Sequence, residues 1–180
     1  MFQDTIAAIA TADAMGAISV IRISGGDAIQ IVTDLTGKYF SNAKGYTIHY
    51  ATIKEGNESV DEVLVSLFRA PKSYTGEDVV EISCHGGVYI TRKVLSLILG
   101  AGARMARRGE FTERAFLSGK MDLSQAEGIN DLIWAKDEIN AKSAIHSLKG
   151  SVAKLMRPLE EDLTQIISNI EVNIDYPEYD

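Results

Sequence analysis

The sequence predicts an α+β domain followed by part of an all-α helical bundle. In the first two-thirds of the chain, short β-branched runs alternate with segments whose apolar residues recur at helical spacing, and from Asp122 onward only the helical spacing remains. The chain has 180 residues, 46% of them hydrophobic, which suits one domain with an extension. We therefore expect the α+β domain in residues 1–119 and the first half of a helical domain in residues 120–180.

The first expected elements are a strand and a helix. Residues 17–23 form a compact apolar and β-branched run that stops at Ser24-Gly25-Gly26, which predicts a strand. The apolar positions of residues 27–35 follow one helical face, and Gly37 supplies a C-terminal stop.

A hairpin, a further strand and a second helix follow. Residues 46–53 and 60–68 are rich in β-branched and aromatic side chains, and the Glu-Gly-Asn-Glu-Ser segment between them supplies turn chemistry. Residues 78–84 predict another short strand, after which Gly86-Gly87 leads into an apolar-faced helix over residues 88–99.

The α+β domain is expected to close with a short helix over residues 110–118, for which Gly119 is the C-terminal stop. Asp122 can cap the next helix, and Ser124 with Glu127 offers a capping box one register later.

The last predicted helix carries a sustained apolar stripe, made of Leu148, Val152, Leu155, Leu159, Leu163, Ile166 and Ile170. Pro158 should kink this helix or end it locally. Two helices cannot bury both of their apolar faces well, so we expect the missing helices from sequence beyond Asp180 or from another chain. Residues 173–180 are interpreted as a helix exit that runs into a linker.

Composition excludes several classes of function. The net charge is −7, but seven of the 25 acidic residues and no Lys or Arg follow Pro158, so residues 1–157 are balanced at 18 of each sign. This is not the basic footprint of a stand-alone nucleic-acid binder. No apolar run approaches the roughly 18 residues of a membrane span, and the N-terminus does not resemble a signal peptide. The single cysteine, Cys84, fits a reducing cytoplasm.

The sequence predicts no catalytic residue and no metal site. Gly37-Lys38 is followed by Tyr39 and Gly119-Lys120 by Met121, so the phosphate-binding P-loop pattern is absent. The three histidines and Cys84 lack the spacing of zinc ligands. Cys84 and His85 are neighbours on a strand and should point to opposite faces, so we interpret Cys84 as a buried structural residue.

Two charges, Arg22 and Glu81, lie inside apolar strands, where an unpaired charge is costly. Either they pair with each other across neighbouring strands, or each meets a ligand in a pocket. A strand-borne carboxylate suits a flat heterocycle that bears an amino group beside a ring N–H, because two parallel hydrogen bonds orient such a ring. Lys120, at the boundary of the two regions, is a third candidate, although alone it reads as a solvated lysine.

Weaker signals are given a structural interpretation. Gly86-Gly87 before a helix leaves backbone N–H groups open to an anion, but double glycines after strands are common. A basic cluster contains acidic residues between its arginines, so we interpret it as a solvated face. It consists of Arg104, Arg107, Arg108 and Arg114.

Five segments stand out along nearly the whole chain: Arg22-Ile23-Ser24-Gly25, Pro71-Lys72-Ser73-Tyr74-Thr75-Gly76-Glu77-Asp78, Glu81 with His85-Gly86-Gly87, Gly109-Glu110-Phe111-Thr112-Glu113-Arg114-Ala115-Phe116, and Lys120-Met121-Asp122-Leu123-Ser124-Gln125-Ala126-Glu127. In this order and spacing they resemble the MnmE (TrmE) family of tRNA-modification GTPases. The ending Ile174-Asp175-Tyr176-Pro177-Glu178 resembles the point at which the family's first helical half runs toward an inserted GTPase domain.

The resemblance implies a tetrahydrofolate-binding domain similar to the glycine-cleavage T-protein, which forms a homodimer and binds 5-formyl- or 5,10-methylene-tetrahydrofolate. Arg22, Glu81 and Lys120 match the family's folate-contacting positions, with Glu81 on the pterin edge and the two cations on polar and anionic parts of the ligand. It also implies a complete protein that modifies the wobble uridine of certain tRNAs with the FAD-dependent partner MnmG (GidA), while GTP hydrolysis drives conformational change.

The sequence departs from the family pattern in some places. The GTPase domain with its GTP, Mg²⁺ and K⁺ sites, the second helical half and a C-terminal cysteine motif are not among these residues. The loop of residues 11–16 lacks the family's usual proline and first glycine, and Arg108 stands where proline is usual. The alternative to a folate-binding module is a purely structural dimerisation scaffold in which Arg22 and Glu81 only tie strands together. A self-contained aminomethyltransferase is disfavoured, since it needs a catalytic acid and two folate-fold halves.

Overall fold

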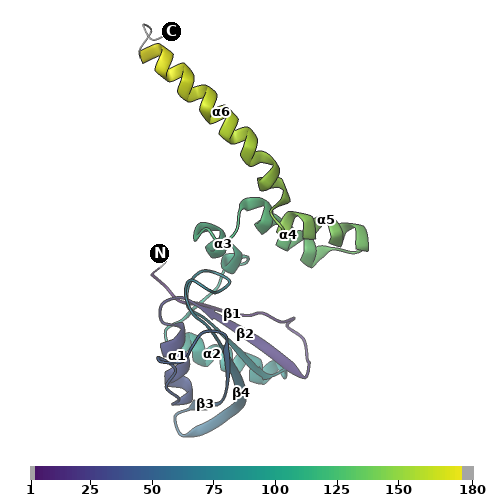
Figure 1. The fold of residues 1–180 in the computed structure, drawn as a ribbon. Coiled ribbons are helices and arrows are strands. Elements are labelled where there is room, and N and C mark those ends of the chain that lie inside the picture. The colour runs from purple at the N-terminus through teal and green to yellow at the C-terminus, as the bar shows by residue number, and fades with distance from the viewer. Residues whose placement is uncertain (1–2, 176–180) are drawn as a thin grey trace. The chain divides into compact units, whose positions relative to one another are not determined.

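The structure, a computed structural model, describes residues 3–175, except for the side chains of residues 151–155. The chain divides into two compact units, Met1–Lys120 and Met121–Asp180 (Figure 1). The first unit combines a mixed sheet with helices and the second is helical, which confirms the predicted α+β class. Among the described residues, no helix combines the length and apolar composition that crossing a membrane requires.

The first unit is built on a six-stranded sheet with the order β3-β4-β5-β2-β1-β6. The strands are β1 (Ile6–Ile9), β2 (Ile18–Ser24), β3 (Thr47–Glu55), β4 (Glu58–Phe68), β5 (Val79–His85) and β6 (Arg104–Met105). Neighbouring strands are antiparallel except for β1 and β6, which run parallel. Strands β1 and β6 were not predicted from the sequence, because segments of four and two residues are too short to show an alternating pattern.

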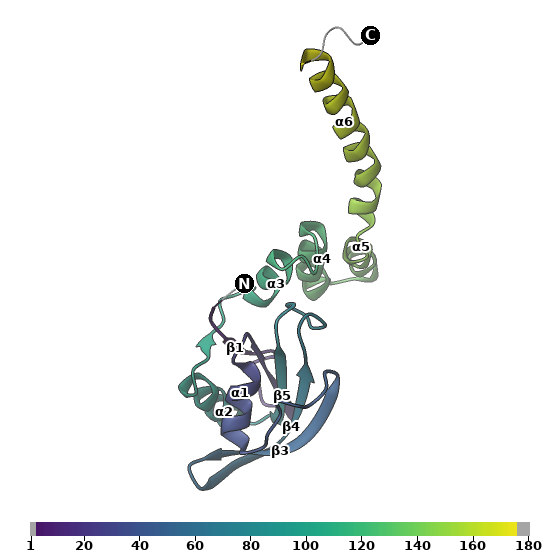
Figure 2. The same cartoon turned by 60° about the vertical axis from the view of Figure 1, so that its left-hand side comes forward.

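Two helices, α1 (Ala28–Thr36) and α2 (Val88–Gly100), cover one face of this sheet (Figure 2). Successive side chains of a strand point to opposite faces, so alternate residues of the central strands enter the core beneath these helices. Ile21 and Ile23 of β2 and Val80 and Ile82 of β5 are buried there. Gly37 has a positive φ of 66° at the end of α1, as its predicted role of helix stop requires.

The opposite face of the sheet is only partly covered. At one end, α3 (Glu110–Leu117) and the loop of residues 69–78 lie against the strands, and Ser24 and Val79 are buried beside them. Farther along the strands, this face exposes four large apolar side chains, which are Ile18, Ile48, Tyr50 and Leu64. We call these four residues the open apolar face.

The second unit contains α4 (Leu123–Trp134), α5 (Glu138–Leu148) and α6 (Ser151–Asp175). Asp122 caps α4 as predicted, and the capping box joins Asp122 to Gln125. The predicted box between Ser124 and Glu127 is wrong, because the N-cap residue lies two positions before Ser124. The side-chain amide of Gln125 also donates to the carbonyl of Leu148, which fixes the start of α4 against the end of α5.

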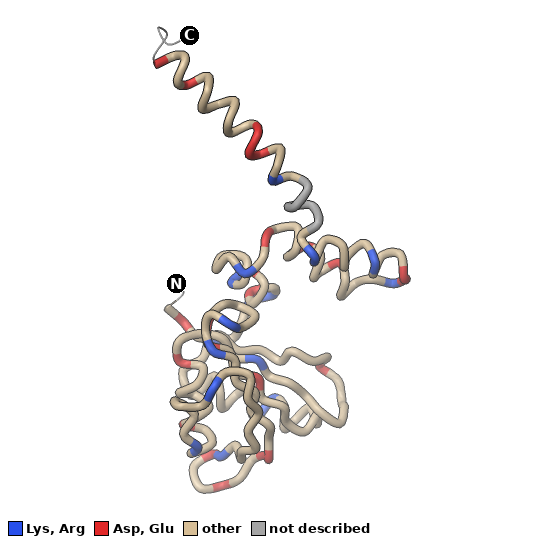
Figure 3. Tube along the Cα trace, viewed as in Figure 1, with Lys and Arg blue, Asp and Glu red and all other residues tan. Residues whose placement is uncertain are grey.

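Helix α6 runs through Pro158, so of the two predicted effects of this proline, a local end of the helix is wrong. Leu148 belongs to α5, which was not anticipated as a separate helix. From Leu159 onward the described stripe residues are exposed, and all the charged residues after Arg157 on this helix are acidic (Figure 3). The stripe positions Val152 and Leu155, and the predicted exit over residues 176–180, lie outside what the structure describes.

Candidate functional site

Arg22 and Glu81 face each other across the centre of the sheet. The register of β2 and β5 places their Cα atoms directly opposite one another. Nη2 of Arg22 lies 2.7 Å from Oε1 of Glu81, and Nε donates to the same oxygen at 2.8 Å. Both side chains are 26% exposed, so the pair lies in the partly covered part of the sheet and is not sealed from solvent. The structure therefore shows the cross-strand pairing that was one of the two interpretations of these charges.

The pair leaves hydrogen-bonding capacity unused. Nε and Nη2 of Arg22 both contact Oε1, and within the described part of the chain Oε2 of Glu81 and Nη1 of Arg22 make no hydrogen bond. A carboxylate has about four acceptor positions and a guanidinium five N–H donors. Pairing with each other and binding a ligand are consequently not exclusive alternatives for these two residues.

Two aromatic rings contact the Arg22 guanidinium. Its Cζ atom lies 5.0 Å from the centre of the Tyr74 ring and 5.5 Å from that of Phe111. Tyr74 comes from the loop of residues 69–78 and Phe111 from α3, and the Tyr74 hydroxyl is hydrogen-bonded to the Thr112 hydroxyl at 2.9 Å. Sequence reasoning did not select either ring. The available signal was their position inside the motifs that carry the family resemblance.

Lys120 is not brought to the charged pair. Its Nζ atom donates to the carbonyl of Pro71 at 2.9 Å, and no contact joins it to Arg22 or Glu81 among the residues that the structure describes. Pro71 lies in the loop of residues 69–78, which also carries Tyr74. A side chain at Gly76 would approach both Ser118 and Lys120, which shows how closely this loop lies against the end of α3. Lys120 therefore flanks the loop that covers the pair.

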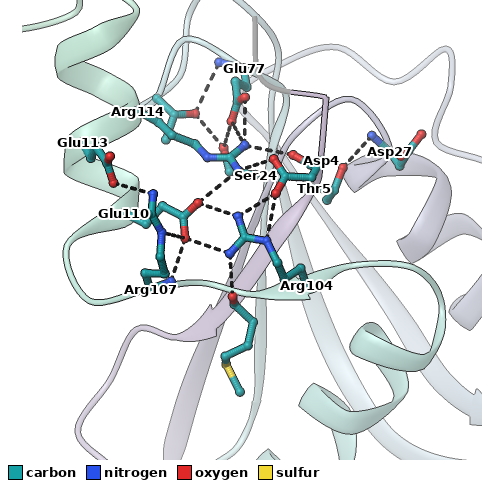
Figure 4. A network of polar contacts seen from close by, with 12 residues as sticks. Asp4, Thr5, Ser24, Asp27, Glu77, Arg104, Arg107, Glu110, Glu113 and Arg114 are labelled. Carbon is teal, nitrogen blue, oxygen red and sulfur yellow. Dashed lines mark hydrogen bonds and ion pairs between the residues drawn. The ribbon is translucent and has the colours of Figure 1, made fainter.

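A buried ionic network holds α3 against the sheet (Figure 4). Arg114 is fully buried, and its Nη2 atom lies 2.7 Å from Asp4 Oδ1 and 3.2 Å from Glu110 Oε1. Its Nη1 atom lies 3.1 Å from Oε1 of Glu77. Arg104 contacts Asp4 and Glu110, each at 2.6 Å.

The electrostatics of this network favour the ionised forms. The hydrogen bond from Arg104, supported by the backbone N–H of Arg107 and by Arg114, lowers the pKa of Glu110 to about 2 against the opposing effect of burial. The interpretation of the arginine cluster as a solvated face is therefore wrong for Arg114, which is buried, while Arg104 stays exposed within its ion pairs. Their partner Asp4 is distant in sequence, so the pairing could not be read from the interleaved charges alone.

A cavity of about 630 Å³ lies between the loop of residues 69–78 and α3. It is lined by Gly26, Ala70, Thr75, Gly76, Glu77, Asp78, Arg114, Leu117 and Ser118. None of Arg22, Glu81 and Lys120 lines this space. The candidate site is therefore defined by the unused atoms of the charged pair and not by this cavity.

Cys84 has the structural role that was predicted. It is buried in the core, burial raises the pKa of its thiol, and its Sγ atom lies 3.5 Å from the carbonyl oxygen of Ser19. His85 is exposed, and its Nδ1 atom lies 2.6 Å from Asp61 Oδ1. Nowhere in the described ranges do three or more His, Cys, Asp or Glu side chains gather in a way that could hold a metal ion.

The fold and site define an α+β domain that carries a polar pair on a partly open sheet face and continues into a helical unit. Residues 5–120 match the family described as the N-terminus of the GTP-binding protein TrmE, and residues 123–180 match the MnmE helical domain. The chain therefore belongs to the MnmE (TrmE) family, as the motifs predicted.

Curated relatives agree with this assignment. The chain is 52% identical to the tRNA modification GTPase MnmE of Lactiplantibacillus plantarum, and 49% identical to the proteins of the same name from Lacticaseibacillus paracasei and Bacillus cytotoxicus. Each alignment covers 98% of this chain but only 39% of the relative. These residues thus correspond to well under half of the length of the relatives.

Proposed function

We propose that this chain is the N-terminal part of a tRNA wobble-uridine modification GTPase whose α+β domain binds a one-carbon tetrahydrofolate, 5-formyl or 5,10-methylene. One observation carries the proposal: the Arg22–Glu81 pair, partly exposed on the sheet, keeps one carboxylate oxygen and one guanidinium nitrogen unused. Membership of the family supports the same class of ligand.

The chemistry of a reduced pterin matches these unused atoms. The ring presents an amino group beside a ring N–H, and a carboxylate accepts from both. Oε1 of Glu81 already accepts the Nε–H group of Arg22 and is ion-paired with Nη2, so Oε2 is the first contact available to the ring. The Lys120 ammonium would then serve the anionic tail of the folate.

We further propose that the α+β domain forms a homodimer through the open apolar face. Ile18, Ile48, Tyr50 and Leu64 are all largely exposed on the side of the sheet that α1 and α2 leave uncovered. An antiparallel sheet with one solvated face normally carries polar residues there, and a contiguous apolar patch marks an interaction surface. A second copy of the same chain is the occupant that the family resemblance implies.

The remaining functions of the family are proposals for the whole protein. Residues 1–180 contain no P-loop, so GTP, Mg²⁺ and K⁺ would be bound by the part of the relatives that this chain does not match. The exposed stripe of α6 fits further helices of the same domain. The partner MnmG and the tRNA would be engaged by the complete assembly, and we propose a cytoplasmic location because tRNA is modified there.

The second candidate, a dimerisation scaffold without a bound folate, is favoured by one specific observation. Arg22 and Glu81 already satisfy part of each other's hydrogen-bonding capacity, as a purely structural pair would. In that case the two charges contribute only to sheet pairing, and their joint replacement by apolar residues has no effect on any ligand.

Calorimetric titration of 5-formyltetrahydrofolate into this chain separates the two candidates. We expect saturable binding by the wild type and an affinity reduced at least tenfold in Glu81→Ala, because a hydrogen bond to a charged group is worth about 1.5–3 kcal/mol. Glu55→Ala is the matched control, since Glu55 is an ion-paired strand carboxylate on the edge strand β3. Equal affinities for wild type and Glu81→Ala would remove Glu81 from the site, and an absence of wild-type binding would leave the scaffold.

A further inference from the structure

We infer that Tyr74 and Phe111 are positioning residues for Arg22: together they hold its guanidinium on Oε1 of Glu81, so that Oε2 of Glu81 and Nη1 of Arg22 stay available to a ligand. The identity of that ligand, a one-carbon folate, rests on the proposed function. The positioning itself rests on the geometry around Arg22.

Arg22 needs more than its ion pair to stay in one conformation. Its side chain is long and 26% exposed, and an ion pair at this degree of exposure gains little over the entropy lost in ordering an arginine. The Tyr74 and Phe111 ring centres lie 5.0 and 5.5 Å from Cζ, which is within the range of a cation–π interaction. The two ring contacts add to the ion pair and favour the single arrangement observed.

The two rings are themselves held from different parts of the chain. The hydrogen bond between the hydroxyls of Tyr74 and Thr112 fastens the loop of residues 69–78 to α3, the helix that carries Phe111. Helix α3 is anchored in turn by Arg114 and Glu110, which are both buried. Both rings are therefore held in place by the rest of the domain and do not have to be ordered when a ligand binds.

The consequence for binding is preorganisation. A ligand that takes Oε2 of Glu81 and Nη1 of Arg22 meets groups that already have their bound orientation, so the ordering cost has been met during folding. Without the rings, Arg22 would sample other rotamers, and its Nη1 atom would no longer keep one orientation relative to Glu81. Tyr74 and Phe111 would thereby strengthen binding through Arg22 without having to touch the ligand.

The first test observes Arg22 directly. In the chain labelled with ¹⁵N-arginine, the Nε–H signal of Arg22, assigned by its absence in Arg22→Lys, reports the contact with Glu81. We expect Phe111→Leu, Tyr74→Leu and their double variant to shift this signal and to speed its exchange with water. Phe116→Leu is the matched control on the same helix, and Phe111→Tyr should restore the signal because it keeps a ring.

The second test measures affinity for 5-formyltetrahydrofolate in a double-mutant cycle. The Tyr74→Leu/Phe111→Leu variant should bind about tenfold more weakly than wild type, on the scale of two cation–π contacts. In an Arg22→Met background the same ring replacements should cause no further loss, because the rings act through Arg22. A merely structural role for the rings would reduce affinity in both backgrounds.

The outcomes are distinguishable. An Arg22 signal that is unchanged in the folded double variant overturns the positioning role, whatever the folate does. An equal further loss of affinity in the Arg22→Met background also overturns it. If the wild type binds no folate, the proposed function fails, and the Arg22 signal alone then decides whether the rings hold this side chain. If the double variant does not fold, Phe111→Leu compared with Phe111→Tyr gives the same decision.

Discussion

Arg22 and Glu81 are bonded through a single carboxylate oxygen: Nε and Nη2 of the arginine both contact Oε1, at 2.8 and 2.7 Å. The two residues face each other on neighbouring antiparallel strands, so this contact follows from the register of the sheet. A symmetric two-oxygen contact would have engaged both oxygens of Glu81. The observed one-oxygen contact leaves a charged pair that is both a cross-strand tie and an open hydrogen-bonding site.

Replacing the pair as a unit should separate its stabilising role from its binding role. We expect Arg22→Met and Glu81→Leu, each alone, to lower the free energy of unfolding by about 1–2 kcal/mol, because each leaves a half-covered charge without its partner. The double variant should recover the wild-type value or exceed it, yet lose folate binding. Urea unfolding measures the first result and calorimetry the second. Additive losses in the double variant would contradict the expected coupling.

The buried carboxylate of Glu110 should be the most sensitive charge in the α+β domain. Its side chain is 2% exposed and contacts both Arg104 and Arg114. Glu110→Gln removes the negative charge beside two cations, and we expect a loss of about 3 kcal/mol in the free energy of unfolding. Glu113→Gln is the control, because Glu113 is largely exposed in its pair with Arg107 and should cost less than about 0.5 kcal/mol. Similar losses in both variants would argue against the network.

The same carboxylate predicts an acid-dependent loss of stability. The pKa of Glu110 falls from 4.5 to about 2 on folding, chiefly through the hydrogen bond from Arg104. A depressed folded-state pKa contributes stability that is fully present above about pH 4.5 and is lost as the pH falls through 2. At roughly 1.4 kcal/mol per unit, this contribution is about 3 kcal/mol. Unfolding curves from pH 6 to 2 should therefore fall more steeply for wild type than for Glu110→Gln, and parallel curves would refute the assignment.

Lys120 should affect ligand binding more than folding. Its ammonium donates to the Pro71 carbonyl on the surface, so Lys120→Gln should change stability by less than about 0.5 kcal/mol. If its ammonium meets the folate tail, affinity should fall several-fold and become less sensitive to salt. Lys72→Gln, an exposed neighbour on the same loop, is the control. Unchanged affinity at low and high salt would remove Lys120 from the site.

A charge on the open apolar face should prevent self-association. Leu64→Asp places a carboxylate among Ile18, Ile48 and Tyr50, where burial against a second copy would be costly. We expect sedimentation to show a concentration-dependent dimer for wild type and a monomer for this variant. Tyr39→Asp changes an exposed aromatic residue outside the face and should leave the dimer intact. A dimer that persists in Leu64→Asp would place the interface elsewhere.

Much of the fold was predictable because its signals are local. Strands β2 and β5 and helices α1, α2 and α3 each show their own period and a nearby glycine stop or turn. The missed strands, β1 and β6, are short and depend on pairing with distant segments. Strand β1 pairs with β2, and β6 pairs with β1. The observed capping box lies two residues before the predicted one, since the side chain of Gln125 bonds the N-cap residue Asp122 as well as that of Glu127 could bond Ser124.

The sequence by itself determined the class of fold, the family and the two charges that a half-buried strand must accommodate. These conclusions depend on period, composition and motif order, which are properties of neighbouring residues. Only the tertiary structure decided that Arg22 and Glu81, 59 positions apart, share one oxygen, and that Arg114 is buried against Asp4, 110 positions away. Strand register and helix packing set these contacts, and both depend on interactions between segments that no local pattern records.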